Sequence, residues 1–263
     1  MCEHGTLGIF DSGMGGLTVF REIATLRPEL DLLYLGDTAR VPYGVRSPDV
    51  IRRYVHANVS YLMTHGISAL VVACNTATAV ALEDLKRDLP IPVFGVIEPS
   101  ARRAACLAPT GTIAVLATET TVRSGAYARA IRHFAKDAVV IECACPLFVP
   151  LAEEGWTDNE VAKRTIEIYL EGFCERGVNV VILGCTHYPL FAGAIKQFLG
   201  NKVLIVDSAR STADEVIHSI PLTQGKGSHR FLVTDMPERF ARVGAAFFGG
   251  LVKNLARVDI PIV

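Results

Sequence analysis

Two cysteines in this sequence stand in similar surroundings that favour chemistry at a thiol. Cys74 follows the apolar run 70–73, and Cys185 follows the run 180–184. Each run predicts a buried parallel strand, and the polar residues after each cysteine predict the start of a helix. Both thiols are therefore expected at the carboxyl end of a strand and beside a helix N-terminus, where open α/β sheets bind ligands and a thiolate is favoured.

Paired thiols of this kind fit the chemistry of racemisation. Moving a proton from one face of a carbon atom to the other requires two acid/base groups that flank the substrate. The reference pKa of a thiol, about 8.5, is close enough to neutrality for one cysteine to act as a thiolate while the other stays protonated. A single cytosolic cysteine is more often a small buried hydrophobic side chain. The repetition of the pattern at Cys74 and Cys185 favours the acid/base interpretation.

Asp11 and Ser12 follow another short apolar run, 7–10, and are expected at the end of the first strand. The carboxylate could hold a substrate ammonium group or orient Cys74, and the hydroxyl could bind a substrate carboxylate. Both residues could also cap the following helix, and the two roles are compatible. The glycine-rich segment 13–16 lacks the spacing of a dinucleotide motif, so it predicts a tight turn and implies no cofactor.

Polar groups near these strand ends are expected to supply the few directed hydrogen bonds that a small polar substrate needs. They belong to Tyr43, Gly44 (through its backbone), Asn75, Thr76 and Thr186. His187 comes two residues after Cys185, and two interpretations of it are open. The imidazole tunes or assists that thiol, or it is a helix-start histidine bonded to the backbone.

Strands and helices alternate along the chain. The expected strands lie near residues 7–10, 32–35, 70–73, 93–97, 112–116, 139–143, 180–184, 203–206 and 231–233. Helices are expected at 17–26, 80–89, 158–174, 208–218 and 237–248. Two more are expected, one that starts at Pro48 with Ser47 as its N-cap, and one that is capped by Thr120 and Thr121 and ends at 134. Residues 145–150 are expected to form a rigid connection. This alternation predicts right-handed βαβ crossovers and mainly parallel sheets.

The pattern begins again near Glu98, which predicts an α/β fold with two pseudo-symmetric lobes. Each lobe is expected to hold a mainly parallel sheet flanked by helices, with an active site in the cleft between them. Residues 1–97 and 208–263 are expected to form the first lobe, with Asp11 and Cys74. Residues 98–207 are expected to form the second lobe, with Cys185.

Composition argues against several classes of partner. The 26 basic and 27 acidic side chains leave a formal net charge of −1, which indicates neither nucleic acid nor an anionic membrane surface. No apolar run approaches the roughly eighteen residues of a membrane helix, and no signal-peptide pattern is present, so a cytoplasmic protein is expected. The seven cysteines are expected as free thiols. No Cys/His pair matches Cys143 and Cys145 at structural-zinc spacing, so no metal is expected.

Four sequence blocks, in order along the chain, carry a family resemblance. They are Phe10-Asp11-Ser12-Gly13-Met14-Gly15-Gly16-Leu17, Pro42-Tyr43-Gly44, Cys74-Asn75-Thr76-Ala77 and Gly184-Cys185-Thr186-His187-Tyr188-Pro189-Leu190. Together they resemble the glutamate racemases of the aspartate/glutamate racemase superfamily. The resemblance implies two α/β lobes related by a pseudo-twofold axis. It also implies cofactor-independent interconversion of L-glutamate and D-glutamate, which supplies D-glutamate for peptidoglycan, cell wall biogenesis and cell shape.

The same resemblance implies individual roles. Cys74 would act on D-glutamate and Cys185 on L-glutamate, with Asp11 and His187 as further catalytic residues. Glu153 would lie near the second cysteine, although a solvated charge at a helix end is the alternative interpretation. A homodimer is expected, with glutamate as the only other partner.

Three alternatives are open on the sequence. The chain could be a superfamily member that acts on aspartate or a hydantoin. A cysteine hydrolase could use Cys185 and His187 with Asp11 as the orienting group, but it would leave Cys74 unexplained. A two-lobed periplasmic-type binding protein would share the cleft but would need an export signal.

Overall fold

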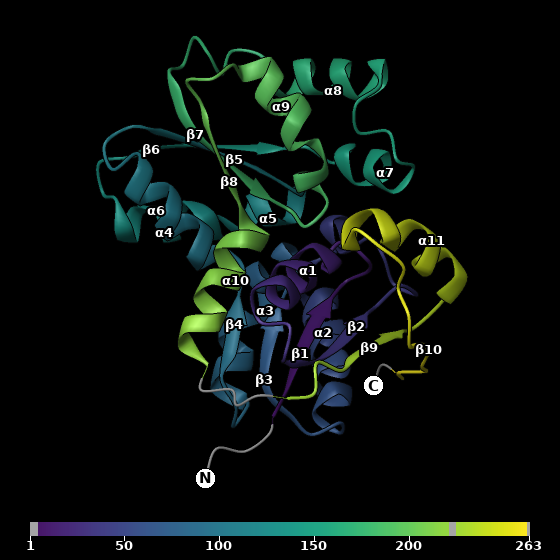
Figure 1. Ribbon diagram of the computed structural model, residues 1–263. Coiled ribbons are helices and arrows are strands. Elements are labelled where there is room, and N and C mark those ends of the chain that lie inside the picture. Colours follow the sequence, from purple (N-terminus) through teal and green to yellow (C-terminus); the bar gives the residue numbers. More distant parts are fainter. Residues whose placement is uncertain (1–4, 221–224, 262–263) are drawn as a thin grey trace.

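The computed structural model describes residues 5–220 and 225–261. Within these ranges the strands form two sheets that lie in separate lobes, one above the other in Figure 1. The larger sheet has the strand order β10-β9-β2-β1-β3-β4, and the smaller has the order β6-β5-β7-β8. All the pairings are parallel. The predicted α/β fold with two mainly parallel sheets flanked by helices is confirmed.

The larger sheet is built from the two ends of the chain. Its elements are β1 (Thr6–Asp11), α1 (Leu17–Leu26), β2 (Asp31–Gly36), the 3-10 helix η1 (Tyr43–Val45), α2 (Pro48–Met63), β3 (Ile67–Val72), α3 (Asn75–Asp88), β4 (Val93–Gly95), α10 (Ser208–Ser219), β9 (His229–Val233), α11 (Pro237–Phe248) and β10 (Leu255–Arg257). The last four follow the smaller sheet in sequence, and β9 pairs with β2. The chain therefore leaves this lobe after β4 and returns through α10.

The smaller sheet is formed by the middle of the chain. Its elements are α4 (Ile97–Leu107), β5 (Thr112–Ala117), α5 (Glu119–Ser124), α6 (Ala126–Phe134), β6 (Val139–Ala144), α7 (Phe148–Glu153), α8 (Glu160–Leu170), β7 (Val178–Gly184), the 3-10 helix η2 (Tyr188–Phe191), α9 (Ala192–Leu199) and β8 (Leu204–Asp207). The exact residue boundaries of the two lobes, 1–97 with 208–263 and 98–207, stay a prediction.

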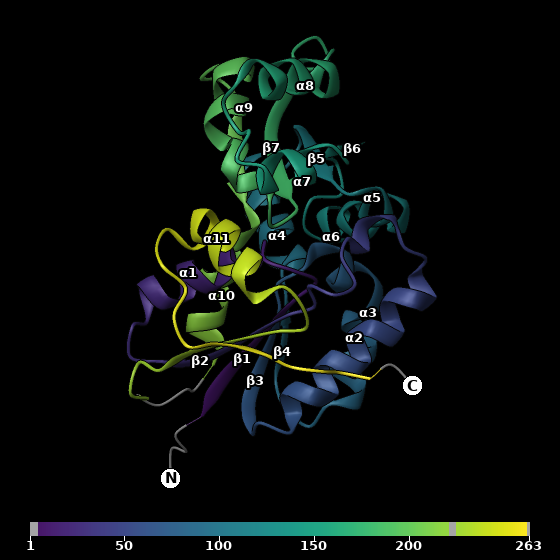
Figure 2. The same cartoon turned by 90° about the vertical axis from the view of Figure 1, so that its right-hand side faces the viewer.

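The central strands are apolar on both faces because helices cover both sides of each sheet. In β1, Leu7 and Ile9 pack into one hydrophobic cluster, whereas Phe10 packs into another on the opposite face. The first cluster also contains Phe148 and Leu183 of the other lobe, so it continues from one lobe into the next. Figure 2 shows α11 close to the junction between the two sheets. The strand ends of both lobes thus rest on a shared apolar cluster.

Several predicted elements differ from the structure. The helix expected to end at 134 is broken at Gly125, whose φ of 62° is left-handed, and Thr118 rather than Thr120 or Thr121 caps its first part. The rigid connection predicted for 145–150 is wrong from Phe148 onward, because α7 begins there. The predicted strand 93–97 ends at 95, since a helix starts at 97.

Other boundaries moved by several residues. The helix predicted for 158–174 is limited to 160–170, and the helix predicted for 80–89 already begins at 75. The sequence did not indicate α4, α9 or β10. The helix bounds 17–26 and 237–248 are confirmed. Ser47 occupies the predicted N-cap position before Pro48, but its side chain makes no capping hydrogen bond.

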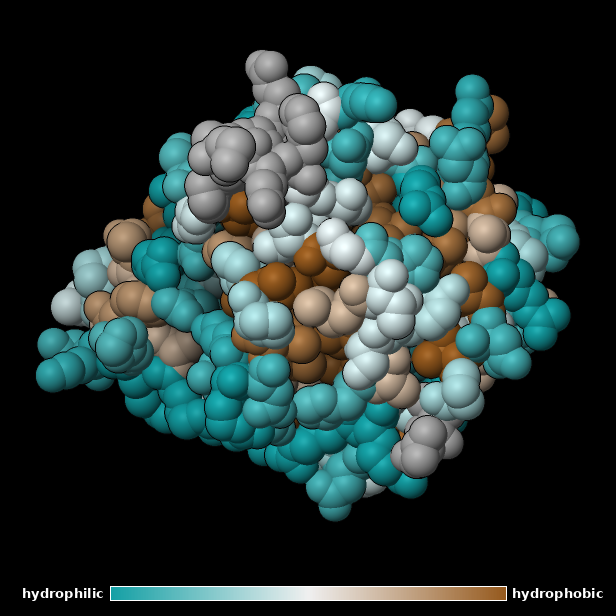
Figure 3. Space-filling model, turned by 90° about the horizontal axis from the view of Figure 1, so that it is seen from below, coloured by the Kyte–Doolittle hydropathy of each residue, from teal (hydrophilic) through white to brown (hydrophobic). Residues whose placement is uncertain are grey.

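The far end of the first lobe carries a mixed surface. Viewed from below Figure 1, hydrophobic residues gather in the middle of a mostly hydrophilic face (Figure 3). This face points away from the second lobe and is not part of the junction. Among the residues that the structure places, no helix is long and apolar enough to cross a bilayer.

Candidate active site

A small cavity of about 40 Å³ lies between the two lobes, at the carboxyl ends of the strands. Its walls come from both lobes and are lined by Ser12, Gly13, Val41, Pro42, Tyr43, Gly44, Cys74, Asn75, Thr76, Thr118, Val149, Glu153, Cys185, Thr186 and His187. This volume has room for only a few water molecules. The structure therefore shows a closed site, in which both predicted cysteines face the same enclosed space.

Cys74 is the N-cap residue of α3, directly after β3. Its Sγ accepts a hydrogen bond from the Ala77 N–H over 3.5 Å, and its thiol donates to Ser12 Oγ over 3.3 Å. Burial raises the pKa of the Cys74 thiol to about 12, and the nearby Asp11 carboxylate adds to this increase. The resting state of Cys74 is therefore the neutral thiol.

Cys185 follows β7 and is buried beside His187, whose Nδ1 lies 4.0 Å from the Cys185 Sγ. The other ring nitrogen, Nε2, lies 3.3 Å from Glu153 Oε1. Burial lowers the pKa of His187, but the contacts with Cys185 and Glu153 outweigh burial and raise that pKa to about 10. The imidazole is therefore protonated at neutral pH and stabilises negative charge on the Cys185 sulfur.

Glu153 is held from the opposite side by Arg239 of α11, with Arg239 Nη2 and Glu153 Oε2 2.9 Å apart. Burial raises the pKa of Glu153, but the lowering by His187 and Arg239 is larger, so the net pKa is below its ordinary value. Arg239, Glu153 and His187 therefore form a series of contacting groups of alternating charge that ends at the Cys185 sulfur. It also joins α11 of the first lobe to α7 of the second. Nothing in the sequence around Arg239 indicated this contact.

We expect His187 to couple folding stability to pH. Because its folded pKa of about 10 lies above the ordinary 6.5, protonation of His187 stabilises the fold below pH 6.5, and this contribution is lost as the pH rises through 10. We therefore expect the free energy of unfolding of the natural protein, relative to that of His187→Asn, to fall as the pH rises from 6.5 to 10. The expected fall is more than about 1.4 kcal/mol, the equivalent of one pKa unit. Urea unfolding of both proteins at pH 6, 8 and 10 measures this difference. A constant difference across the range would contradict it.

Asp11 lies behind the cavity wall and not in it. Its side chain is fully buried, and its Oδ2 accepts a hydrogen bond from the Gly13 N–H over 2.9 Å, whereas Oδ1 has no hydrogen-bond partner among the described residues. Burial raises the pKa of Asp11, although the surrounding N–H groups and His187 oppose this. The carboxylate thus contributes charge close to Cys74 while it shapes the turn after β1.

Close contacts between the lobes surround the cavity. A Cβ atom at Gly15 would lie 2.2 Å from Thr186 Oγ1 and 2.5 Å from His187 Nδ1, so only glycine allows this approach. Thr18 Oγ1 also donates to the backbone oxygen of Thr186 over 3.3 Å. The glycine-rich turn, predicted as a tight turn, therefore leaves space for the loop that follows Cys185 to pack against it.

Threonines of the second lobe complete the wall near the first cysteine. Thr76 Oγ1 and Thr118 Oγ1 are 2.9 Å apart, and Thr120 Oγ1 donates to the backbone oxygen of Gly44 over 2.9 Å. Asn75 Nδ2 donates to the hydroxyl of Tyr127 over 2.8 Å. The sequence reading missed Thr118 because it ended the strand at 116 and placed the cap later. Its position directly after an apolar strand was the signal that could have found it.

Of the eleven residues singled out from the sequence, ten line the cavity and Asp11 lies behind it. The ring nitrogens of His187 contact Cys185, Thr186 and Glu153, and its ring packs edge-on against Phe247. Val149 is a further wall residue that the sequence did not indicate. In residues 5–220 and 225–261 no group of three or more His, Cys, Asp or Glu residues could hold a metal ion. The six cysteines in these ranges are free; Cys2 lies outside them.

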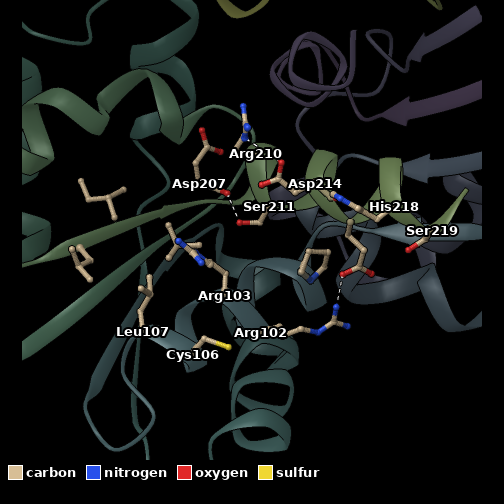
Figure 4. A pocket seen from close by; sticks show the side chains of 15 residues that line it. Arg102, Arg103, Cys106, Leu107, Asp207, Arg210, Ser211, Asp214, His218 and Ser219 are labelled. Atoms are coloured by element: carbon tan, nitrogen blue, oxygen red, sulfur yellow. Dashed lines mark hydrogen bonds and ion pairs between the residues drawn. The ribbon is translucent and has the colours of Figure 1, made fainter. Parts of the chain in front are cut away.

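A larger groove of about 870 Å³ lies elsewhere, between α4, β8 and α10 (Figure 4). None of the predicted site residues lines it. Two of its arginines are neutralised locally, because Arg102 pairs with Glu98 and Glu215, and Arg210 pairs with Glu22 and Asp214. The enclosed cavity between the lobes is therefore the better candidate for an active site.

Comparisons with known proteins show the family of this chain. The model of the Asp/Glu/Hydantoin racemase family matches residues 17–216. The chain is 50% identical to a glutamate racemase of Geobacter metallireducens over 97% of its own length and 96% of the relative's length.

Solved structures are also similar over nearly the whole chain. The crystal structure of a glutamate racemase isoform of Bacillus anthracis is 35% identical, with a TM-score of 0.94 and 99% of each chain covered. A glutamate racemase of Francisella tularensis, solved in complex with D-glutamate, is 30% identical, with a TM-score of 0.90, and covers 97% of this chain and 98% of its own. With the family match extending over most of the sequence, this chain belongs to the Asp/Glu/hydantoin racemase family.

Proposed function

We propose that this protein is a glutamate racemase, an isomerase that interconverts L-glutamate and D-glutamate without a cofactor. The observation that carries the proposal is the meeting of Cys74 and Cys185, one from each lobe, in a single enclosed cavity. Relatives that share up to half of its residues over nearly the full length carry that name. The product D-glutamate would serve peptidoglycan synthesis, and so cell wall biogenesis and cell shape.

The charges around the two thiols support an assignment of which cysteine first takes a proton from the substrate and which one donates a proton. His187 is protonated and lies beside Cys185, so its charge would favour Cys185 as the sulfur that takes the proton, whereas the raised pKa of Cys74 keeps that thiol neutral. L-glutamate would lose its α-proton to Cys185 and receive the proton of Cys74 on the opposite face. After this transfer Cys185 carries the proton and Cys74 has lost it, which is the arrangement required for the reaction that starts from D-glutamate.

Asp11 and Glu153 would support these transfers without touching the reacting carbon. The Asp11 carboxylate beside Cys74 disfavours a thiolate there, so Cys74 would hold the proton that it donates in one direction and would be a strong base once deprotonated in the other. Glu153 fixes the His187 ring from behind. We assign substrate binding to the polar groups that line the wall, namely Ser12, Tyr43, Gly44, Asn75, Thr76, Thr186 and His187, with Thr118 as an addition.

Substrate entry would require the lobes to separate. Glutamate has ten non-hydrogen atoms and cannot fit in a cavity of about 40 Å³. Opening would break the contacts of Gly15 and Thr18 with the loop after Cys185. Closure around the substrate would then exclude water and strengthen the electrostatic effects of His187 and Asp11.

The cysteine hydrolase alternative fits the contacts less well. It needs Asp11 to orient His187, but the Nε2 of that ring is already paired with Glu153, and Nδ1 faces Cys185. It also gives no reason for a second buried thiol in the same cavity.

A racemase that acts on aspartate or on a hydantoin would use the same two thiols. Assays with these substrates beside glutamate therefore distinguish that alternative from a glutamate racemase. A cytoplasmic location and a homodimer stay predictions.

The proposal predicts loss of optical activity from L-glutamate in the presence of the purified, reduced protein alone. Circular dichroism follows this loss, and the same assay after dialysis against a chelator should give an unchanged rate. In D₂O, the recovered glutamate should carry deuterium at the α-carbon, because a thiol of the protein returns a proton that has exchanged with solvent. Racemisation that depends on added metal or pyridoxal phosphate, or faster turnover of aspartate than of glutamate, would contradict the proposal.

A further inference from the structure

Two cysteines outside the candidate active site form a close pair in the second lobe. Cys143 is near the end of β6, and Cys145 follows that strand, so their side chains fall on the same face of the chain. The two Sγ atoms are 3.7 Å apart. Cys143 is partly exposed, whereas Cys145 is buried. The mechanism proposed above uses neither of them.

We propose that Cys143 and Cys145 are a redox-sensitive dithiol, in which Cys143 reacts with a hydroperoxide and Cys145 then closes a disulfide. The arrangement supplies an accessible attacking sulfur with a protected resolving sulfur beside it. A disulfide requires the sulfur atoms to approach to about 2.0 Å, a movement that a side-chain rotation and a small backbone shift at the end of a strand can provide. Cys106 and Cys174 are more exposed, but no second sulfur lies beside either of them among the residues that the structure places.

The hydrogen bonds of the pair favour this order of reaction. The Cys145 thiol donates to Cys143 Sγ, which stabilises a thiolate on Cys143 and lowers its pKa. The same hydrogen bond and burial raise the pKa of Cys145, so it remains a thiol. When protonated, the Cys143 thiol donates to the backbone oxygen of Tyr169 over 3.4 Å, and the Cys145 thiol also lies 3.6 Å from the backbone oxygen of Cys143. Cys143 is thus the more nucleophilic of the two sulfurs.

The chemistry balances with a hydroperoxide as the oxidant. The Cys143 thiolate attacks the terminal peroxide oxygen, the O–O bond breaks, and the leaving oxygen takes a proton to become water or an alcohol. Cys143 is then a sulfenic acid. The Cys145 sulfur attacks the Cys143 sulfur, the S–O bond breaks, and the hydroxide that leaves takes the Cys145 proton and departs as water.

The pair is connected to the active site through the start of α7. The Cys145 backbone oxygen accepts hydrogen bonds from the hydroxyl of Tyr188 over 2.8 Å and from the Phe148 N–H over 3.1 Å. Phe148 begins α7, the helix that carries Glu153 to His187. Closing the disulfide would shift the Cys145 backbone, and with it the helix that positions Glu153. We therefore infer that oxidation lowers turnover, a consequence that rests on the proposed function.

Mass spectrometry of the intact chain tests the dithiol without reference to activity. The reduced protein is treated with limiting hydrogen peroxide, unfolded, alkylated and digested with trypsin. Both cysteines fall in the single tryptic peptide 137–163, and every other cysteine falls in a different peptide. We expect this peptide to become two hydrogen atoms lighter and to resist alkylation before the peptides of Cys106 and Cys174 change. If those exposed cysteines oxidise first and peptide 137–163 stays reduced, the proposal is wrong.

Single variants distinguish the attacking sulfur from the resolving sulfur. Cys145→Ser should accumulate a sulfenic acid at Cys143 that dimedone labels, whereas Cys143→Ser should leave Cys145 unlabelled. Cys106→Ser is the matched control and should oxidise at 137–163 like the natural protein. Labelling of Cys145 in the Cys143→Ser protein would overturn the assigned order of reaction.

Activity assays then test the link to α7. After identical peroxide treatment, the natural protein should lose glutamate racemisation by about tenfold or more, and dithiothreitol should restore it. Cys143→Ser should keep its activity. Equal loss in both proteins would show that oxidation acts at Cys74 or Cys185 and would overturn the link. A protein with no racemase activity before oxidation would contradict the proposed function and leave the mass result as the test of the dithiol.

Discussion

Replacing Cys74 or Cys185 by alanine is expected to lower racemisation of both glutamate enantiomers by at least about 10²-fold. Each direction needs one thiol to take the α-proton and the other to return one, so the loss of either group stops both directions. Circular dichroism with L-glutamate and with D-glutamate measures the two rates. Cys106→Ala is the matched control, because Cys106 is exposed and far from the cavity lining.

The surviving thiol in each variant should still act on one enantiomer. With a glutamate analogue that carries a leaving group at the β-carbon, abstraction of the α-proton leads to elimination and needs one base only. Cys74→Ala retains Cys185 and should eliminate from the L-analogue, and Cys185→Ala retains Cys74 and should eliminate from the D-analogue. If either alanine variant racemises glutamate near the natural rate, the two-thiol mechanism is wrong, and a one-base mechanism with His187 or Asp11 must replace it.

Gly15→Ala is expected to reduce turnover by about 10²-fold while the protein still folds. The added methyl group would lie 2.2 Å from Thr186 Oγ1 and 2.5 Å from His187 Nδ1, so the loop that carries Cys185 cannot keep its present position. The lobes would close to a slightly wider state, in which the two sulfurs no longer flank the α-carbon correctly. Because Gly15 lies in the turn before α1 and not in a strand or helix of the hydrophobic core, the effect on stability should be much smaller.

Steady-state kinetics and thermal unfolding together measure this effect. The expected result is a fall in kcat with the unfolding temperature nearly unchanged. Gly193→Ala in α9 is the matched control, because a Cβ atom there meets nothing within 4 Å. Natural activity in Gly15→Ala would show that the closed arrangement is not the reactive one. A large fall in the unfolding temperature would instead show that Gly15 is needed for the stability of the fold.

The pattern of short apolar runs that end in polar residues was sufficient to predict much of the site. In a parallel sheet the carboxyl ends of the strands meet at one edge, so residues that directly follow strands come together whatever the length of chain between them. This reasoning placed Ser12 and Cys74 near one another in the first lobe, and the expected cleft between two similar lobes placed Cys185 opposite them; all three line the cavity. The alternation of strands and helices likewise predicted the two parallel sheets, because crossover connections leave few other arrangements.

Contacts between side chains of different lobes could not be read from the sequence in the same way. Arg239 reaches Glu153 because α11 of the first lobe lies against α7 of the second, and no local pattern around either residue specifies that placement. The helix α7 itself was mistaken for a rigid connection, since two prolines in 145–150 are compatible with a turn as well as with a first helical turn. Tertiary packing decided between them.

The sequence by itself thus determined which residues stand at strand ends, because strand and helix propensity are local properties of the chain. Only the tertiary structure decided the protonation states and the fit of the two lobes. Burial and the distant Asp11 carboxylate raise the pKa of Cys74, and, against the effect of burial, contacts with the neighbouring Cys185 and the distant Glu153 raise the pKa of His187. The need for glycine at position 15 arises from a loop 171 residues further along the chain, because the approach of the two lobes leaves no space for a Cβ atom.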